Sequence, residues 1–124
     1  MKLRTLFTIN AVLAIAFGLG FVFMPVTLIS FYGAELTEVG VVIGQLLGAA
    51  FLGIGILRWL VRNSGESEVL RAIVLTAFIE DTIGFIFALR AQLAGVMNAL
   101  GWSIVAIYAF LAIGYGYFQF QKKN

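Results

Sequence analysis

The sequence contains no cysteine, no histidine and a single proline in 124 residues. Without histidine there is no imidazole to ligate zinc, copper or haem, or to relay protons near neutral pH. Without cysteine there is no disulfide, no thiolate nucleophile and no dithiol redox centre. The serines have no plausible base to activate them as nucleophiles. We therefore expect no metal, no cofactor and no enzymatic activity.

Charge is also scarce, since only 11% of the residues are charged while 62% are hydrophobic. A soluble domain has about 25% charged and about 45–50% apolar residues, because water must wet its surface. The composition therefore predicts a protein embedded in a lipid bilayer. At about 20 apolar residues per crossing, the length allows four spans and no additional soluble domain. The net charge of +2 does not indicate a nucleic-acid partner, because the basic residues sit at the ends of the predicted helices.

Long apolar runs predict an all-α protein, a four-transmembrane-helix bundle in which residues 1–124 form a single transmembrane domain. The predicted spans are residues 4–24, 38–61, 68–89 and 96–119. The first apolar run is too long for one crossing, and Pro25 should break it because proline lacks the backbone donor. A short interfacial segment ending at Gly33 should follow. We interpret the first span as permanent rather than as a cleaved signal peptide. Thr37 and Ser67 are the predicted N-caps of the second and third spans.

Basic residues fall unequally on the two sides of this arrangement. Only Arg90 lies on one side, and the other side holds seven: Lys2, Arg4, Arg58, Arg62, Arg71, Lys122 and Lys123. Because cytoplasmic loops are enriched in Lys and Arg, both termini should face the cytoplasm of a bacterial inner membrane. Aromatic residues are placed at the two expected interfaces. Tyr32 and Trp102 lie near the outer one, and five lie near the inner one: Trp59, Tyr115, Tyr117, Phe118 and Phe120.

Two adjacent carboxylic acids, Glu80 and Asp81, lie near the midpoint of the third span. Each costs about 2.5–3.5 kcal/mol at the centre of a membrane helix, so the pair is the most expensive feature of the sequence. A helical wheel places both acids on the face with small and polar residues, so we expect them to point inward, to the helix bundle or to a partner. Candidate polar partners are Thr76 on the same helix, Tyr108 at the same depth in the fourth span, and Gln45 in the second.

Three interpretations of the acidic pair stay open at this point. Two carboxyl groups this close and away from water cannot both comfortably ionise, so they could hold a proton or bind a cation. They could also be a protonated, hydrogen-bonded clamp between helices. The third interpretation is a contact for a cationic or hydrogen-bonding group on another subunit.

Glycines form a stripe along the second span, namely Gly40, Gly44, Gly48 and Gly55. Such a stripe lets another backbone approach closely, which is how helices associate in lipid. The stripe could pack inside the monomer, against small residues such as Ala14 and Gly18 or Ala109 and Ala112, or it could form an oligomer interface. In either case these glycines are predicted to be helix-packing residues.

Two short likenesses suggest an internal repeat. Residues 11–17 (AVLAIAF) resemble residues 72–78 (AIVLTAF), and Gly53-x-Gly55 has a counterpart in Gly114-x-Gly116. A parallel two-plus-two duplication and chance recurrence of short apolar strings both explain the observation.

The strings GLGFVFMPVTLISFYG, LLGAAFLGIGILRW and NALGWSIVAIY together resemble the small four-span bacterial membrane proteins that are DoxX-like or uncharacterised. The resemblance implies a four-helix fold and an accessory role, and it transfers no site residue. In its four short spans and its membrane-embedded acid, the chain is also similar to small multidrug resistance transporters. It differs from them in carrying its acids in the third span and in its strong charge bias.

The sequence thus predicts a non-catalytic accessory or interaction subunit of a membrane assembly or homo-oligomer. Its expected partners are the lipid bilayer and other membrane subunits or further copies of itself. The alternative is a small proton-coupled transporter or channel that uses Glu80 and Asp81.

Overall fold

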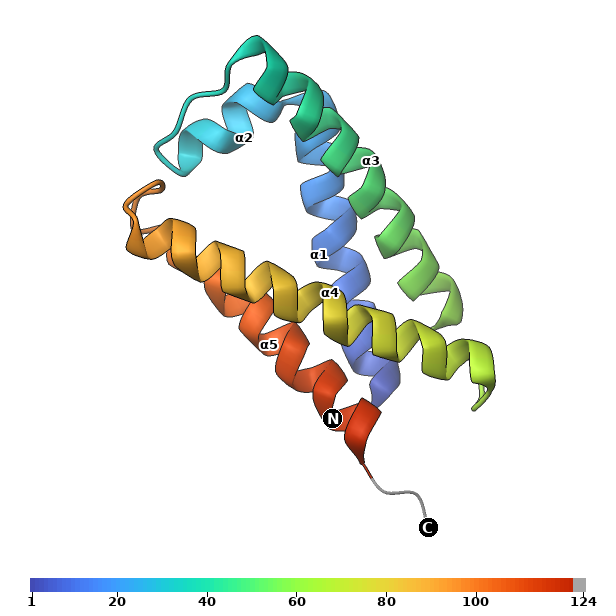
Figure 1. Cartoon of the computed structure of the whole chain (residues 1–124). Helices are drawn as coiled ribbons and strands as arrows, with labels where there is room; N and C mark the ends of the chain where they lie inside the picture. Colours follow the sequence, from blue (N-terminus) through green and yellow to red (C-terminus); the bar gives the residue numbers. More distant parts are fainter. Residues whose placement is uncertain (122–124) are drawn as a thin grey trace. The chain divides into compact units, whose positions relative to one another are not determined.

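The computed structural model describes residues 1–121. This part of the chain is all-helical: α1 (Leu3–Phe23), α2 (Pro25–Phe31), α3 (Glu38–Val61), α4 (Glu68–Leu93) and α5 (Gly101–Phe120) (Figure 1). Of these helices, α1, α3, α4 and α5 are long and apolar enough to cross a membrane. The predicted all-α fold with four candidate spans is confirmed. The predicted basic residues Lys122 and Lys123 lie outside the described residues.

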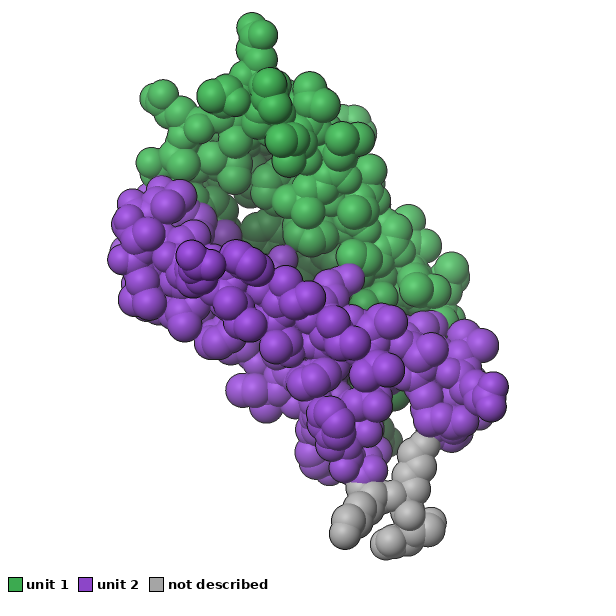
Figure 2. All heavy atoms as spheres, in the orientation of Figure 1, with its two compact units in different colours: residues 1–62 green, residues 63–124 purple. Residues whose placement is uncertain are grey.

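The helices form two compact units, coloured separately in Figure 2. Unit 1 is Met1–Arg62 and contains α1, α2 and α3, whereas unit 2 begins at Asn63 and contains α4 and α5. Each unit is built on one pair of long helices, which is the arrangement that a two-plus-two duplication predicts. Both the duplication and the single transmembrane domain stay predictions.

In unit 1, α1 and α3 run antiparallel and touch through glycines (Figure 1). A Cβ placed on Gly48 would lie 2.7 Å from the Gly18 carbonyl oxygen. A Cβ on Gly55 would lie 2.7 Å from Ile15 Cγ1 and 3.1 Å from the Ala11 carbonyl oxygen. The backbones are therefore close enough that only glycine fits at these positions, as expected where small residues drive helix association in lipid.

Pro25 separates α1 from α2, as predicted. Helix α1 ends at Phe23, and Pro25 occupies the first position of α2, where its missing N–H costs no hydrogen bond. Helix α2 then ends before Gly33, whose φ of 78° lies in the left-handed region that glycine adopts readily. The short helix predicted after the first span is therefore present.

In unit 2, α4 and α5 lie side by side and antiparallel (Figure 1). A Cβ on Gly84 would overlap the ring of Tyr108, and a Cβ on Gly116 would lie 3.0 Å from the Phe78 ring. Phe78 also meets Phe120 edge-on, with 5.4 Å between ring centroids. Unit 2 thus packs rings against glycines, whereas unit 1 brings two backbones together.

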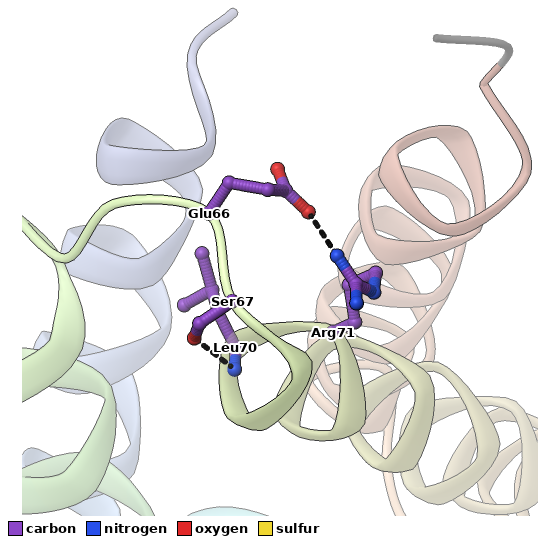
Figure 3. Close-up of polar contacts among 4 residues, drawn as sticks. All are labelled: Glu66, Ser67, Leu70 and Arg71. Atoms are coloured by element: carbon purple, nitrogen blue, oxygen red, sulfur yellow. Dashed lines mark hydrogen bonds and ion pairs between the residues drawn. The ribbon is translucent and has the colours of Figure 1, made fainter.

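Both predicted N-caps are confirmed. The Thr37 hydroxyl accepts a hydrogen bond from the Gly40 N–H at 3.0 Å, and the Ser67 hydroxyl accepts one from the Leu70 N–H at 3.1 Å. Figure 3 shows the Ser67 cap beside an exposed ion pair between Glu66 and Arg71, at 3.3 Å. Each cap satisfies a backbone donor that the first turn of a helix would otherwise leave without a partner.

The turn between α4 and α5 differs from the prediction of spans at 68–89 and 96–119. Helix α4 continues to Leu93, and α5 begins only at Gly101. Hydropathy marks where the apolar run stops, whereas the helix stops where the backbone turns at Gly95, with φ of 75°. The Asn98 side chain then accepts a hydrogen bond from the Leu100 N–H and stabilises the turn.

Of the three tyrosines predicted at the membrane interfaces, Tyr115 and Tyr32 lie inside the protein, whereas Tyr117 is 63% exposed. Tyr115 is completely buried and Tyr32 is 7% exposed, whereas Trp59 and Trp102 are 42% and 48% exposed. The depth of these residues along a helix is readable from the sequence, but the direction in which a ring points depends on the neighbouring helix.

Candidate functional site

The two adjacent acids of α4 have different environments. The Asp81 side chain is buried, with 3% exposed, whereas the Glu80 side chain is exposed. Of the two alternatives that were predicted, Asp81 therefore points into the protein, and a partner for the Glu80 face stays a prediction. Successive residues of a helix are about 100° apart, so two neighbours cannot share the centre of one face.

Asp81 belongs to the buried stripe of α4, together with Leu70, Val74 and Ala77. These residues are spaced three and four apart, which is the period of one helix face. Thr76 and Glu80, also four apart, occupy a second face that is exposed. The site is therefore a carboxyl group inside the protein and a second carboxyl group on its surface, at the same depth.

Thr76 uses its hydroxyl proton within α4. Its Oγ1 donates to the carbonyl oxygens of Ala72, at 2.9 Å, and Ile73, at 3.1 Å. This local hydrogen bonding is common for threonine in helices. Of the three predicted polar partners, Thr76 therefore donates its hydroxyl proton to the backbone of its own helix.

Tyr108 is the predicted partner that lies against α4. Its ring packs on Gly84, which is one helical turn beyond Glu80. Gly84 is three and four residues after the two acids, so the Tyr108 ring lies within about one helical turn of both of them along α4.

Gln45, the third predicted partner, forms a hydrogen bond within unit 1. Its Nε2 donates to the Val22 carbonyl oxygen of α1 at 3.3 Å. A side-chain amide that bonds a backbone carbonyl across two membrane helices ties the helices together. The bond supports a structural role for Gln45.

Three of the four stripe glycines face α1 or α2. Gly48 and Gly55 contact α1 as described, and a Cβ on Gly44 would lie 3.4 Å from the Phe21 ring and 3.7 Å from Pro25. Gly40 instead lies beside Leu36 and Thr37, just before its own helix. The stripe is therefore occupied by contacts within unit 1.

Unit 1 contains buried polar residues that the sequence analysis did not identify as a group. Asn10 of α1 and Arg58 of α3 are each 4% exposed. The antiparallel register that pairs Gly55 with Ala11 places Arg58 at the level of Thr8, two residues before Asn10 in α1. The available signal was the position of Arg58, one turn after Gly55 on the glycine stripe, which predicts that it faces α1.

Gln92 is a further buried polar residue, at the end of α4, with 9% exposed. Its Nε2 donates to the Asn98 carbonyl oxygen at 3.0 Å, and its Oε1 lies against Gly101 at the start of α5. Gln92 therefore connects the two ends of the α4–α5 turn. This role of Gln92 was not predictable from the sequence, because it depends on the path of the turn.

No protein-family model matches the chain, and neither a curated protein nor a solved structure matches it. The exposed acid at mid-span is therefore the feature from which a function can be inferred.

Proposed function

We propose that the protein is a non-catalytic membrane subunit that associates with another membrane protein, or with a second copy, through the face of α4 that carries Glu80. The observation that supports the proposal is the exposure of Glu80 halfway along a helix of 26 residues. A partner helix over this face would shield the carboxyl group from lipid.

The free-energy cost of a carboxylate in lipid favours a partner helix over the Glu80 face. Glu80 is 12 residues after the first residue of α4, which is about 18 Å along the helix at about 1.5 Å per residue. A carboxylate at this depth costs about 2.5–3.5 kcal/mol when it faces hydrocarbon. Neighbouring side chains on the same face, such as Ile83 and Phe87, are 51% and 59% exposed and offer apolar contact area. Association would thus replace lipid around a polar group with protein.

Cysteine cross-linking in native membranes tests the proposal directly, because the chain contains no cysteine of its own. We expect Ile83→Cys, on the Glu80 face, to form a cross-linked species with a second copy or with another polypeptide. The matched control is Ile113→Cys on α5, which is 73% exposed and lies on a different helix. Equal cross-linking at both positions, or none at Ile83, would refute the proposal.

Charge-removing variants separate association from folding. We expect Glu80→Gln to weaken co-purification in mild detergent while the thermal unfolding temperature stays unchanged, because Glu80 is exposed. We expect Asp81→Asn to lower the unfolding temperature, because Asp81 is buried. If Glu80→Gln unfolds the protein as readily as Asp81→Asn, the exposed acid is structural.

A second candidate function is a small proton-coupled transporter. It is favoured by the same pair, since a surface carboxyl beside a buried one can pass a proton inward. In this case proteoliposomes would move protons or a cationic solute, and both Glu80→Gln and Asp81→Asn would abolish the flux. A wild-type protein that moves neither would exclude this function.

We also propose that the protein is a bacterial inner-membrane protein with cytoplasmic termini, and that its resemblance to DoxX-like proteins reflects a related accessory role. Within unit 1, Lys2, Arg4, Arg58 and Arg62 gather at one end of the antiparallel helices. A reporter inserted at Gly65 should therefore report cytoplasm, and one inserted near Ala34 should report the outside. The reverse result would reject this orientation.

A further inference from the structure

One end of unit 1 gathers exposed and half-buried basic residues around a tryptophan. We call this group the basic end; it consists of Lys2, Arg4, Trp59 and Arg62. Lys2 and Arg4 are exposed at the start of α1, and Trp59 is 42% exposed in the last turn of α3. The register that pairs Gly55 with Ala11 brings Arg62 to the level of Arg4.

The basic end has no acidic residue of unit 1 to neutralise it. Every residue of unit 1 is described, and its carboxylates are Glu35 and Glu38, which lie at the opposite end beside the start of α3. The next acid along the chain, Glu66, is 3.3 Å from Arg71 (Figure 3). Unit 1 therefore provides no carboxylate at its basic end.

The side chains are also arranged as a membrane interface requires. The Arg62 guanidinium lies 3.7 Å from the centroid of the Trp59 ring, and it donates to the Trp59 carbonyl oxygen at 2.5 Å. Stacking on an indole holds a guanidinium in place without neutralising it. Tryptophan prefers the headgroup level of a bilayer, so this pair fixes a cation at the depth of the lipid phosphates.

We propose that the basic end binds the headgroups of anionic phospholipids. Several cations beside an interfacial aromatic residue, at the ends of two packed membrane helices, complement a layer of lipid phosphates. The inference is independent of the role of Glu80, which lies in unit 2.

Lipid binding to the purified protein tests the proposal. The wild-type protein in a nonionic detergent is titrated with phosphatidylglycerol or with phosphatidylcholine, and the bound lipid is measured by native mass spectrometry. We expect phosphatidylglycerol to bind at least about fivefold more tightly. Each cation near an anionic surface contributes about fivefold, so Lys2→Gln with Arg4→Gln should lower the affinity for phosphatidylglycerol by about 5–25-fold.

The matched control is Arg90→Gln, because Arg90 is also a cation near an aromatic ring, 5.7 Å from the Phe87 centroid, but belongs to unit 2. We expect Arg90→Gln to keep the preference for phosphatidylglycerol. If the double variant does not fold, Lys2→Gln alone replaces it, with an expected loss of about fivefold.

Three outcomes would overturn the proposal. One is equal binding of phosphatidylglycerol and phosphatidylcholine to the wild-type protein. Another is a loss of preference in Arg90→Gln as large as in the basic-end variant, which would indicate a general charge effect. The third is displacement of the lipid by inorganic phosphate at the same phosphate concentration, which would identify a site for free phosphate rather than lipid.

Discussion

The close contact of α1 with α3 predicts that Gly48 does not tolerate even a methyl group. In Gly48→Ala the new Cβ would lie 2.7 Å from the Gly18 carbonyl oxygen and 2.9 Å from Phe21 Cβ and Val22 Cγ2. Ordinary contact begins at 3.4 Å, so the shortfall from 3.4 to 2.7 Å is 0.7 Å. The carbonyl oxygen belongs to the backbone, and therefore the two helices must move apart.

The cost of this movement can be estimated. A gap of about 0.5–1 Å removes about a quarter to a half of each dispersion contact, and overpacking in a tight interior costs about 1–3 kcal/mol in total. Alanine also gains about 1 kcal/mol over glycine through helix propensity. Gly53→Ala is the matched control, because it lies in the same helix and its Cβ would have no atom within 4 Å. The propensity gain cancels between the two variants, so Gly48→Ala should be about 1–3 kcal/mol less stable than Gly53→Ala.

The assay is equilibrium unfolding in mixed micelles with increasing dodecyl sulfate. In a Trp102→Phe background, Trp59 is the only tryptophan and its fluorescence reports on unit 1. The free energies of unfolding of the two variants are compared in this background. Gly18→Ala should show a similar loss, and the double variant Gly18→Ala with Gly48→Ala should lose less than the sum, since both methyl groups disturb the same crossing. Equal stability of Gly48→Ala and Gly53→Ala would refute the reasoning.

Three further predictions concern single side chains. Ser67→Ala should lower the free energy of unfolding by about 1 kcal/mol through loss of the cap on the Leu70 N–H, whereas Ser64→Ala in the same loop should have no effect in the same dodecyl sulfate titration. Gly84→Ala should lower the free energy of unfolding of unit 2, as measured by Trp102 fluorescence. Adding Tyr108→Leu to this variant should recover part of the lost stability, because it removes the ring that the new methyl group contacts. If no stability is recovered, the methyl group clashes with another residue. Asn10→Leu should raise the free energy of unfolding by about 1 kcal/mol, because Asn10 Oδ1 is buried and has no hydrogen-bond partner within residues 1–121. A lower free energy of unfolding would instead show that the Asn10 amide forms a hydrogen bond.

Local features of the fold were readable from the sequence. Pro25, Thr37 and Ser67 act through the backbone within a few residues of themselves, so their break and caps could be predicted without knowledge of packing. The number of spans was also predictable, because the length of an apolar run has to match the thickness of a bilayer. The end of α4 was not, since hydropathy does not mark the glycine turn at Gly95.

The candidate site was only partly predictable. Glu80 and Asp81 stood out because a carboxylate at mid-span is costly wherever it points. Their different exposure depends on which side of α4 is covered, and this is set by the neighbouring helix rather than by the acids themselves. For the same reason, the hydrogen bond of Gln45 to Val22 could not be inferred from depth alone.

The sequence by itself determined that this chain forms helices, four of them long and apolar enough to cross a membrane, because composition and run length reflect the solvent around each helix. It also determined that Glu80 and Asp81 lie near the middle of a span, since rise along a helix is constant. Only the tertiary structure decided that the glycine stripe of α3 is filled by α1 and that Asp81 is inside while Glu80 is outside. Rotation about the helix axis is fixed by contacts between residues far apart in the chain, and in lipid no difference in hydrophobicity guides these contacts.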